Sequence, residues 1–106
     1  MTNREARIAK NEVIFREVNE RIRDVVPSEN GAVDFLCECG QEDCVEQIQL
    51  TRAEYERVRA DPVQFFVKPG HASQDVEDVM EEHDRYLLVR KHAEEQEIAR
   101  RADPRA

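Results

Sequence analysis

Three cysteines lie within eight residues of this chain, and the chain has no others. They are Cys37, Cys39 and Cys44, arranged as C-x-C-G-x₃-C. Thiolates this close together on a turn are the ligands that zinc and iron sites use. An odd number of cysteines, two of them separated by one residue, does not fit a disulfide framework. The run therefore predicts a bound metal, and the alternative is three free, partly buried thiols.

Structural zinc takes four ligands, so the cysteine run needs one more. The chain offers three histidines, His71, His83 and His92. We favour His71, because it follows Pro69 and Gly70 on a turn after a predicted strand. A carboxylate of Asp43 or Glu38 could supply oxygen instead, and water in the fourth position would open the site to catalysis or sensing. The predicted site is Zn²⁺ held by Cys37, Cys39, Cys44 and His71.

Gly40 stands inside the cysteine run and has a mechanical reason to be there. A glycine can adopt positive φ, which lets the chain fold tightly round a metal and aims nearby amides at sulfur. The eight-residue run is similar to the post-SET segment of histone lysine methyltransferases, in which three such cysteines join a fourth to bind zinc. This local similarity implies metal chemistry and not the methyltransferase activity.

Size and composition predict one domain over residues 1–106, stabilised by little apolar core. The chain has 106 residues, no tryptophan and six aromatic residues, which predicts a thin, aliphatic core. A metal would add folding free energy directly to such a domain.

The net charge is −8, from 24 acidic and 16 basic residues. Two segments contain acids and no base: residues 31–50 hold five acids and residues 71–84 hold six. This acidic face would repel phosphate backbones, so we expect no nucleic acid to bind there, although the basic stretch 85–106 leaves it open elsewhere. The alternative is a solvated acidic surface that only aids solubility.

After Met1 the residues Thr2 to Glu5 are polar, and this start does not resemble a signal peptide. The sequence also lacks a run of about 18 apolar residues, so we expect no membrane association. These features predict the cytoplasm, where thiols stay reduced and clustered cysteines favour metal over disulfide.

Residues 3–26 are predicted to form an amphipathic helix that packs on the domain or projects from it. Apolar residues at helical spacing predict one buried stripe. The stripe is Ile8, Phe15, Val18, Ile22 and Val25, widened by Ile14 and Val26. The acid-before-base pairs Glu12/Arg16 and Glu17/Arg21 are expected on the outer face. The stripe also fits a short heptad seam, so homo-oligomerisation through this helix is the alternative to packing on the domain's own sheet.

Residues 32–92 are predicted to form the zinc-binding core around one small sheet. Strands at 32–38 and 45–50 form a hairpin that carries the cysteines, with Ile48 and Leu50 on its buried face. Thr51 and Glu54 form a capping box that begins a short helix, which ends before Pro62.

Further strands and a weak helix complete the predicted core. Residues 63–67 read as a strand, 76–81 and 85–91 as a hairpin, and 93–106 as a weak helix followed by a tail. The segment 76–81 could equally form a helical turn. The pattern predicts a single α+β domain.

Four sequence blocks occur together in this chain: NEVIFREVNE at 11–20, FLCECG at 35–40, LTRAEYERVR at 50–59 and PGH at 69–71. On these blocks the chain resembles a family of short bacterial proteins with the pattern FxCECGxxxC, LTxxEYExVR and PGH. The resemblance implies that His71 belongs with the cysteines as one unit. It implies no activity, substrate or partner.

These features predict a small zinc-binding protein that acts as a protein-interaction or regulatory module, with the metal in a structural role. Its partner would be another protein, contacted through helix 3–26 or the acidic face. The alternative is a thiol-based redox or metal sensor, because zinc-held thiolates are nucleophilic. A zinc-dependent hydrolase or lyase comes third, because no general base is evidently paired with the site, so we do not expect an enzyme.

Overall fold

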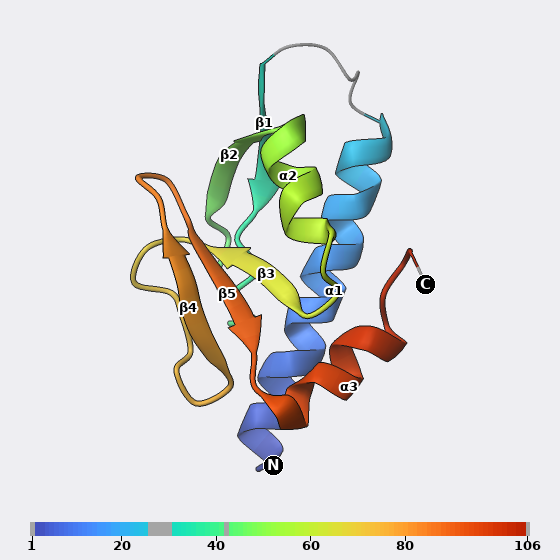
Figure 1. The fold of residues 1–106 in the computed structure, drawn as a ribbon, viewed down its shortest axis with the longest axis vertical. Helices are drawn as coiled ribbons and strands as arrows, with labels where there is room; N and C mark the ends of the chain where they lie inside the picture. The colour runs from blue at the N-terminus through green and yellow to red at the C-terminus, as the bar shows by residue number, and fades with distance from the viewer. Residues whose placement is uncertain (1, 26–30, 42, 106) are drawn as a thin grey trace.

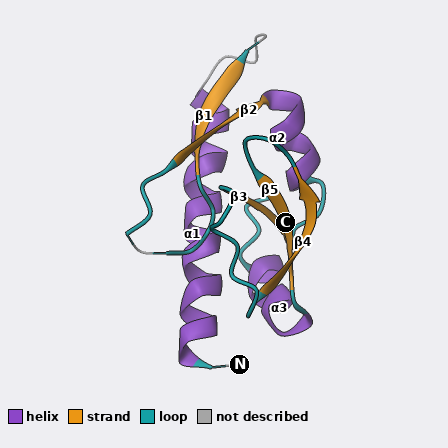
Figure 2. Cartoon of the chain, turned by 90° about the vertical axis from the view of Figure 1, so that its left-hand side faces the viewer, coloured by secondary structure: helices purple, strands orange, loops and turns teal. Residues whose placement is uncertain are grey.

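A long N-terminal helix runs along most of the protein beside two small sheets (Figure 1 and Figure 2). The computed structural model describes residues 2–25, 31–41 and 43–105. In chain order the elements are α1 (Asn3–Val25), β1 (Ala32–Leu36), β2 (Gln47–Thr51), α2 (Arg52–Arg59), β3 (Gln64–Val67), β4 (Glu77–Glu82), β5 (Leu87–Lys91) and α3 (Ala93–Arg101). This mixture confirms the predicted α+β class. No helix within the described ranges combines the length and apolarity needed to cross a bilayer.

The described strands form two antiparallel sheets, whereas a single sheet was predicted. One sheet pairs β1 with β2, and the other has the order β3-β5-β4. The sheets meet where the chain leaves β1, which ends at Leu36 and not at the predicted Glu38. The amide of Cys37 still donates to Glu46 beside β2, but the amide of Glu38 donates to Phe66 of β3, each at 3.0 Å. The chain therefore changes partner strand within the cysteine segment.

The face that α1 turns toward the interior is mostly polar, so the predicted apolar stripe holds only in part: Ile8 is buried and Ile22 packs against the core. The buried residues of α1 are Ile8, Ala9, Glu12, Arg16, Asn19 and Glu20. By contrast, Ile14, Val18 and Val25 are 54%, 39% and 80% exposed, and Phe15 and Ile22 are half-buried. The predicted outer pair of Glu12 with Arg16 is absent among the described contacts, while the pair of Glu17 with Arg21 is exposed as expected. Val26 and most of the following turn lie outside the described residues.

Partners on distant elements explain why polar side chains of α1 are buried. Arg16 donates to the carbonyls of Pro62 and Ala99, at 2.5 and 2.7 Å. The side-chain amide of Asn19 donates to the carbonyl of Leu36 at 3.0 Å and accepts from its amide at 2.8 Å, so it extends the hydrogen bonding of β1. A buried polar group is tolerated when it is hydrogen-bonded, and helical periodicity alone cannot reveal such partners.

The core is more aromatic than the predicted aliphatic one. Its fully buried aromatic residues are Phe35, Tyr55, Phe65, Phe66 and Tyr86. Phe35 stacks on Tyr55 with ring centroids 4.3 Å apart, and Phe66 meets both rings edge-on. These residues come from both sheets and α2, so the aromatic cluster packs the two sheets together.

Several local predictions are confirmed. Thr51 and Glu54 form the capping box of α2. Ile48 and Leu50 are buried at 2% and 0% exposure. The segment 76–81 is largely strand, since β4 pairs antiparallel with β5. These features depend on residues close in sequence, where spacing is informative.

Candidate metal centre

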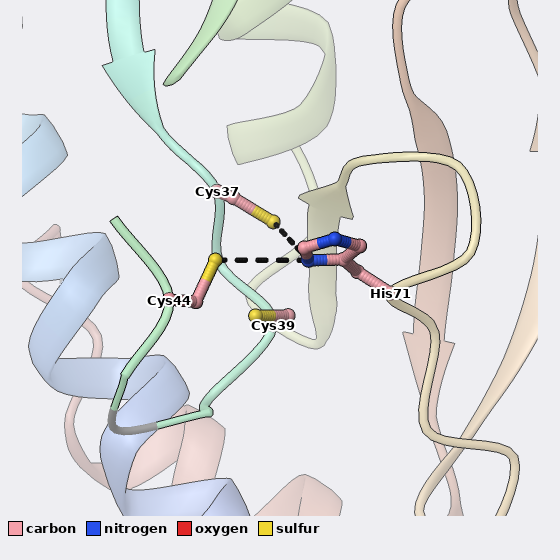
Figure 3. Close-up of side chains that lie close together, drawn as sticks. All are labelled: Cys37, Cys39, Cys44 and His71. Atoms are coloured by element: carbon pink, nitrogen blue, oxygen red, sulfur yellow. Dashed lines mark hydrogen bonds between the residues drawn. The ribbon is translucent and has the colours of Figure 1, made fainter. Parts of the chain in front are cut away.

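The cysteine run and His71 come together at the junction of the two sheets (Figure 3). Cys37 and Cys39 follow β1, Cys44 precedes β2, and His71 lies in the loop from β3 to β4. One ligand atom from each residue lies within 4.8 Å of the others. The structure therefore brings together all four residues that the sequence predicted as ligands.

The distances at this cluster suit tetrahedral coordination. His71 Nδ1 lies 3.7 Å from Cys37 Sγ and 3.6 Å from Cys44 Sγ. Around a tetrahedral ion with zinc-like bond lengths, about 2.3 Å to sulfur and about 2.1 Å to nitrogen, sulfur and nitrogen would stand about 3.6 Å apart. Three sulfurs and one imidazole nitrogen also form a donor set that suits zinc-like ions better than it suits harder cations. The residues thus fit a tetrahedral metal ion.

Glycines shape the chain on both sides of the cluster. Gly40 has φ +76° beside Cys39, and Gly70 has φ +88° beside His71. Both values lie in the left-handed region that glycine adopts without steric cost. The turn at Gly70 is closed by the amide of His71, which donates to the carbonyl of Lys68 at 2.9 Å. The two tight turns direct ligands from separate segments toward one point.

Main-chain amides surround the sulfur atoms. The amide of Lys68 donates to Cys37 Sγ at 3.2 Å. The main-chain amides of Gln41 and Glu46 act to lower the pKa values of Cys39 and Cys44 respectively. Donors of this kind stabilise thiolates and orient them toward a metal. The sequence suggested such amides near Gly40 but did not reveal Lys68, whose amide reaches the site only because β3 ends beside Cys37.

The thiols of Cys37 and Cys39 influence each other's ionisation. The hydrogen bond with Cys37 lowers the pKa of Cys39 to about 5, despite the opposing effect of burial. The same bond, with burial, raises the pKa of Cys37, and burial raises the pKa of Cys44. The lowered pKa favours a thiolate at Cys39, whereas a metal ion that binds here must displace the protons of Cys37 and Cys44, whose pKa values are raised.

The other candidate ligands have different surroundings. His83 Nε2 donates to the carboxylate of Glu81 at 2.8 Å, and the His83 ring stacks on Tyr86. His92 lies 3.1 Å from Asp78. Neither histidine joins the cysteines in the described metal-ligand cluster.

The two carboxylates that were considered as oxygen ligands are also elsewhere. Asp43 is exposed and is not part of the cluster. Glu38 is fully buried and accepts from Arg59 at 2.6 Å and from Asn19 at 2.8 Å. Since alternate residues of an extended chain point to opposite sides, Cys37 and Cys39 share one side while Glu38 occupies the other.

A supporting contact to α1 was not predicted. Asn11 Nδ2 donates to the carbonyl of Gly40 at 3.0 Å, which ties the cysteine turn to the helix. No sequence signal reveals this contact, because it joins residues 29 positions apart.

Comparison with protein-family models, with curated proteins and with solved structures gives no match. The resemblance to short bacterial proteins therefore stays a prediction, and the case for function rests on the geometry of the site: three cysteines and one histidine that could together hold a metal ion.

Proposed function

We propose that Cys37, Cys39, Cys44 and His71 bind Zn²⁺ and that the metal is structural. The observation that carries this proposal is the convergence of one nitrogen and three sulfur ligand atoms within 4.8 Å. Four protein ligands complete a tetrahedral zinc site and leave no position for a reacting water. This supports a closed structural site over the hydrolase or lyase alternative.

The position of the cluster supports a clasp that holds the sheets together. Its ligands come from the end of β1, the approach to β2 and the loop after β3. Zinc at this point would crosslink the two sheets where few strand hydrogen bonds do so. Binding would then contribute directly to folding free energy, as in small zinc domains. In the reducing cytoplasm the thiols would remain available for this role.

The biological role that we propose for the clasp is to shape a protein-interaction or regulatory module. The closed ligand set and the absence of a general base hydrogen-bonded to the cluster among the described residues favour this role over catalysis. The partner would be another protein, in keeping with the acidic surface. Association of copies through α1, where Ile14, Val18 and Val25 are exposed, is an alternative mode.

Metal content of the purified protein tests the zinc proposal. We expect near-stoichiometric zinc in the wild-type protein by elemental analysis. Cys44→Ser and His71→Ala should each lose most of it, since removal of one ligand opens the site. His83→Ala is the matched control and should keep its zinc, because His83 bonds Glu81 instead. A folded, metal-free wild-type protein that takes up no added zinc would contradict the proposal.

A second candidate function is a redox or metal sensor. Its supporting observation is that Cys44 and His71 are only partly buried, so an oxidant could reach one sulfur. Zinc release at near-stoichiometric peroxide would support the sensor. Retention of zinc under a large excess of peroxide would contradict the sensor and support the structural role.

A further inference from the structure

The outer edge of β2 carries unpaired main-chain groups. In the β1–β2 ladder, Cys37 and Glu46 are a hydrogen-bonded pair. Such pairs alternate along an antiparallel ladder, so Ile48 also bonds to β1, while the amide and carbonyl of Gln47 and Gln49 point away from it. Among the described strands β2 pairs with β1 alone, so these outward groups have no partner strand. An edge of this kind can accept another strand.

The hydrogen bonds at the ends of the ladder support this alternation. Leu36 and Thr51 occupy outward positions on β1 and β2 respectively. Each indeed bonds away from the ladder: Leu36 to the side chain of Asn19, and the Thr51 amide to Glu54. Gln47 and Gln49 themselves line a groove.

That groove has a volume of about 440 Å³ and lies between β2 and the β4–β5 turn, which approach one another in Figure 1. The wall opposite β2 consists of Lys68 and Pro69 after β3, and Asp84 and Arg85 in the β4–β5 turn. Its size is within the range of sites that hold small ligands, roughly 300–1,000 Å³.

The candidate metal centre adjoins both walls of the groove. Gln47 is three residues after Cys44, and Pro69 is two residues before His71. The amide of Lys68 is itself hydrogen-bonded to Cys37 Sγ. A metal at the cluster would therefore fix the separation of the two walls.

The charges of the groove favour an acidic occupant. Lys68 and Arg85 line it against the single carboxylate of Asp84, although the protein as a whole carries −8. Lys68 lies 3.6 Å from Glu46, and Arg85 lies 3.4 Å from Glu54. These are exposed pairs of the kind worth about 0–1 kcal/mol, so both cations remain available to a ligand.

We propose that this groove binds an extended acidic peptide segment of another protein, which adds a strand to β2 by pairing with Gln47 and Gln49 and places a carboxylate near Lys68 and Arg85. The inference rests on the proposed zinc clasp, because the metal positions both walls. The segment lacks proline at the paired positions, because each pairing needs a main-chain donor.

The test uses a phage library of short random peptides selected on the zinc-loaded full chain. We expect enriched peptides to be acidic and rich in strand-forming residues. Their affinity is then measured on variants by fluorescence anisotropy. Gln49→Pro removes an outward amide without breaking a bond to β1, a position where an edge strand tolerates proline. Its control, Gln49→Thr, keeps the amide.

A second pair of variants tests the charge requirement. Arg85→Glu reverses a cation of the groove, whereas Arg100→Glu makes the same change at an exposed residue of α3, outside the groove. We expect Gln49→Pro and Arg85→Glu each to weaken binding at least about tenfold, and both controls to bind like the wild type. Zinc content and circular dichroism of each variant establish that it is folded.

Three outcomes would overturn the proposal. The zinc-loaded protein selects no peptide, or it selects peptides whose affinity is the same for Gln49→Pro and Gln49→Thr. Alternatively, light scattering reveals a dimer that Gln49→Pro abolishes, in which case the occupant of the edge is a second copy. Failure of the zinc clasp is distinguishable, because it appears as protein without metal before any selection begins.

Discussion

Glu38 stands between two candidate ligands, yet its carboxylate belongs to a buried network on the other side of the chain. It accepts from Arg59 at 2.6 Å, from Asn19 at 2.8 Å and from the amide of Phe66 at 3.3 Å. Arg59 and Glu38 are 2% and 0% exposed, so water cannot replace either partner. At this scale the fold depends on charges that are tolerated only because they are paired.

Glu38→Gln should therefore destabilise the protein by about 3 kcal/mol, because it leaves the Arg59 guanidinium buried without a counter-charge. Urea unfolding of the zinc-loaded proteins measures the change. Glu97→Gln is the control: it removes the exposed pair with Arg101 and should cost at most about 0.5 kcal/mol. Equal losses of stability in the two variants would show that the buried ion pair contributes no more than the exposed one.

At the scale of elements, α1 supports the cysteine turn through a close backbone approach at Gly40. A Cβ on Gly40 would lie 2.7 Å from the carbonyl oxygen of Ile8 and 2.8 Å from Cγ of Glu12. The carbonyl belongs to the helix backbone, which cannot move without shifting α1. Gly70 has a similar φ but no atom within 4 Å of its added Cβ.

These two glycines give a matched pair of substitutions. Gly70→Ala should cost about 1 kcal/mol, from backbone strain alone. Gly40→Ala should cost roughly 1–3 kcal/mol more, because it also forces the turn away from α1. Thermal unfolding measures the stabilities, and limited proteolysis reports whether α1 loosens. A Gly40→Ala protein as stable as Gly70→Ala would contradict the close packing.

The same helix is joined to β4 and β5 by a buried triad. Lys91 contacts the carboxylates of Glu12 and Glu77, and all three side chains are at most 1% exposed. Two carboxylates share one ammonium, and one oxygen of Glu12 has no hydrogen-bond partner among the described residues. Burial and the nearby Glu77 raise the pKa of Glu12 well above its ordinary value, although Lys91 opposes this.

A raised carboxyl pKa gives stability that is present at low pH and lost as pH rises through the folded value. At neutral pH the burial of the Glu12 carboxyl group is therefore a net cost, and Glu12→Gln should be at least as stable as the wild type. This advantage should shrink toward about pH 5. Lys91→Met, which leaves two buried carboxylates, should instead lose about 3 kcal/mol or more. Urea unfolding at both pH values measures the free energies of unfolding. A large loss of stability for Glu12→Gln at neutral pH would contradict the prediction.

At the scale of the whole molecule, Arg105 ties the C-terminal segment to two helices. Its guanidinium donates to Glu20 of α1 at 2.5 Å and to Glu56 of α2 at 2.7 Å. Burial acts to raise the pKa of Glu20, but the hydrogen bonds from Arg105 and Tyr55 outweigh it and lower that pKa. Arg105 also lowers the pKa of Glu56. The segment predicted as a tail thus contributes to the fold.

Arg105→Ala should lower stability by about 1 kcal/mol, since the contacts are partly exposed. Lowered carboxyl pKa values give stability that is present above the ordinary value of 4.5 and is lost as pH falls through the folded values. The difference between variant and wild type should therefore vanish in acid. Thermal unfolding from neutral to acidic pH measures this difference in stability. Arg100→Ala, at an exposed residue of α3, is the control. A difference that persists unchanged in acid would point to a cause other than the ion pairs.

Some elements were predictable because their signals are local. The capping box of Thr51 and Glu54, the alternation at Ile48 and Leu50, and the hairpin of β4 and β5 all follow from residues within one short segment. The prediction for the stripe on α1 was largely wrong for the opposite reason, because burial there depends on residues distant in sequence. Helical spacing identifies a face but not what lies against it, and here the partners of Arg16 are carbonyls at Pro62 and Ala99.

The sequence by itself determined which ligands this protein can offer: a set of three thiols, and the turn chemistry at Gly40 and Gly70 that bends the chain around them. Only the tertiary structure decided that His71, and neither His83 nor His92, lies beside those thiols. It also decided which face of α1 is buried. The physical reason is the same in both cases, because a metal ligand and a buried charge are each selected by partners that the fold brings from distant parts of the chain.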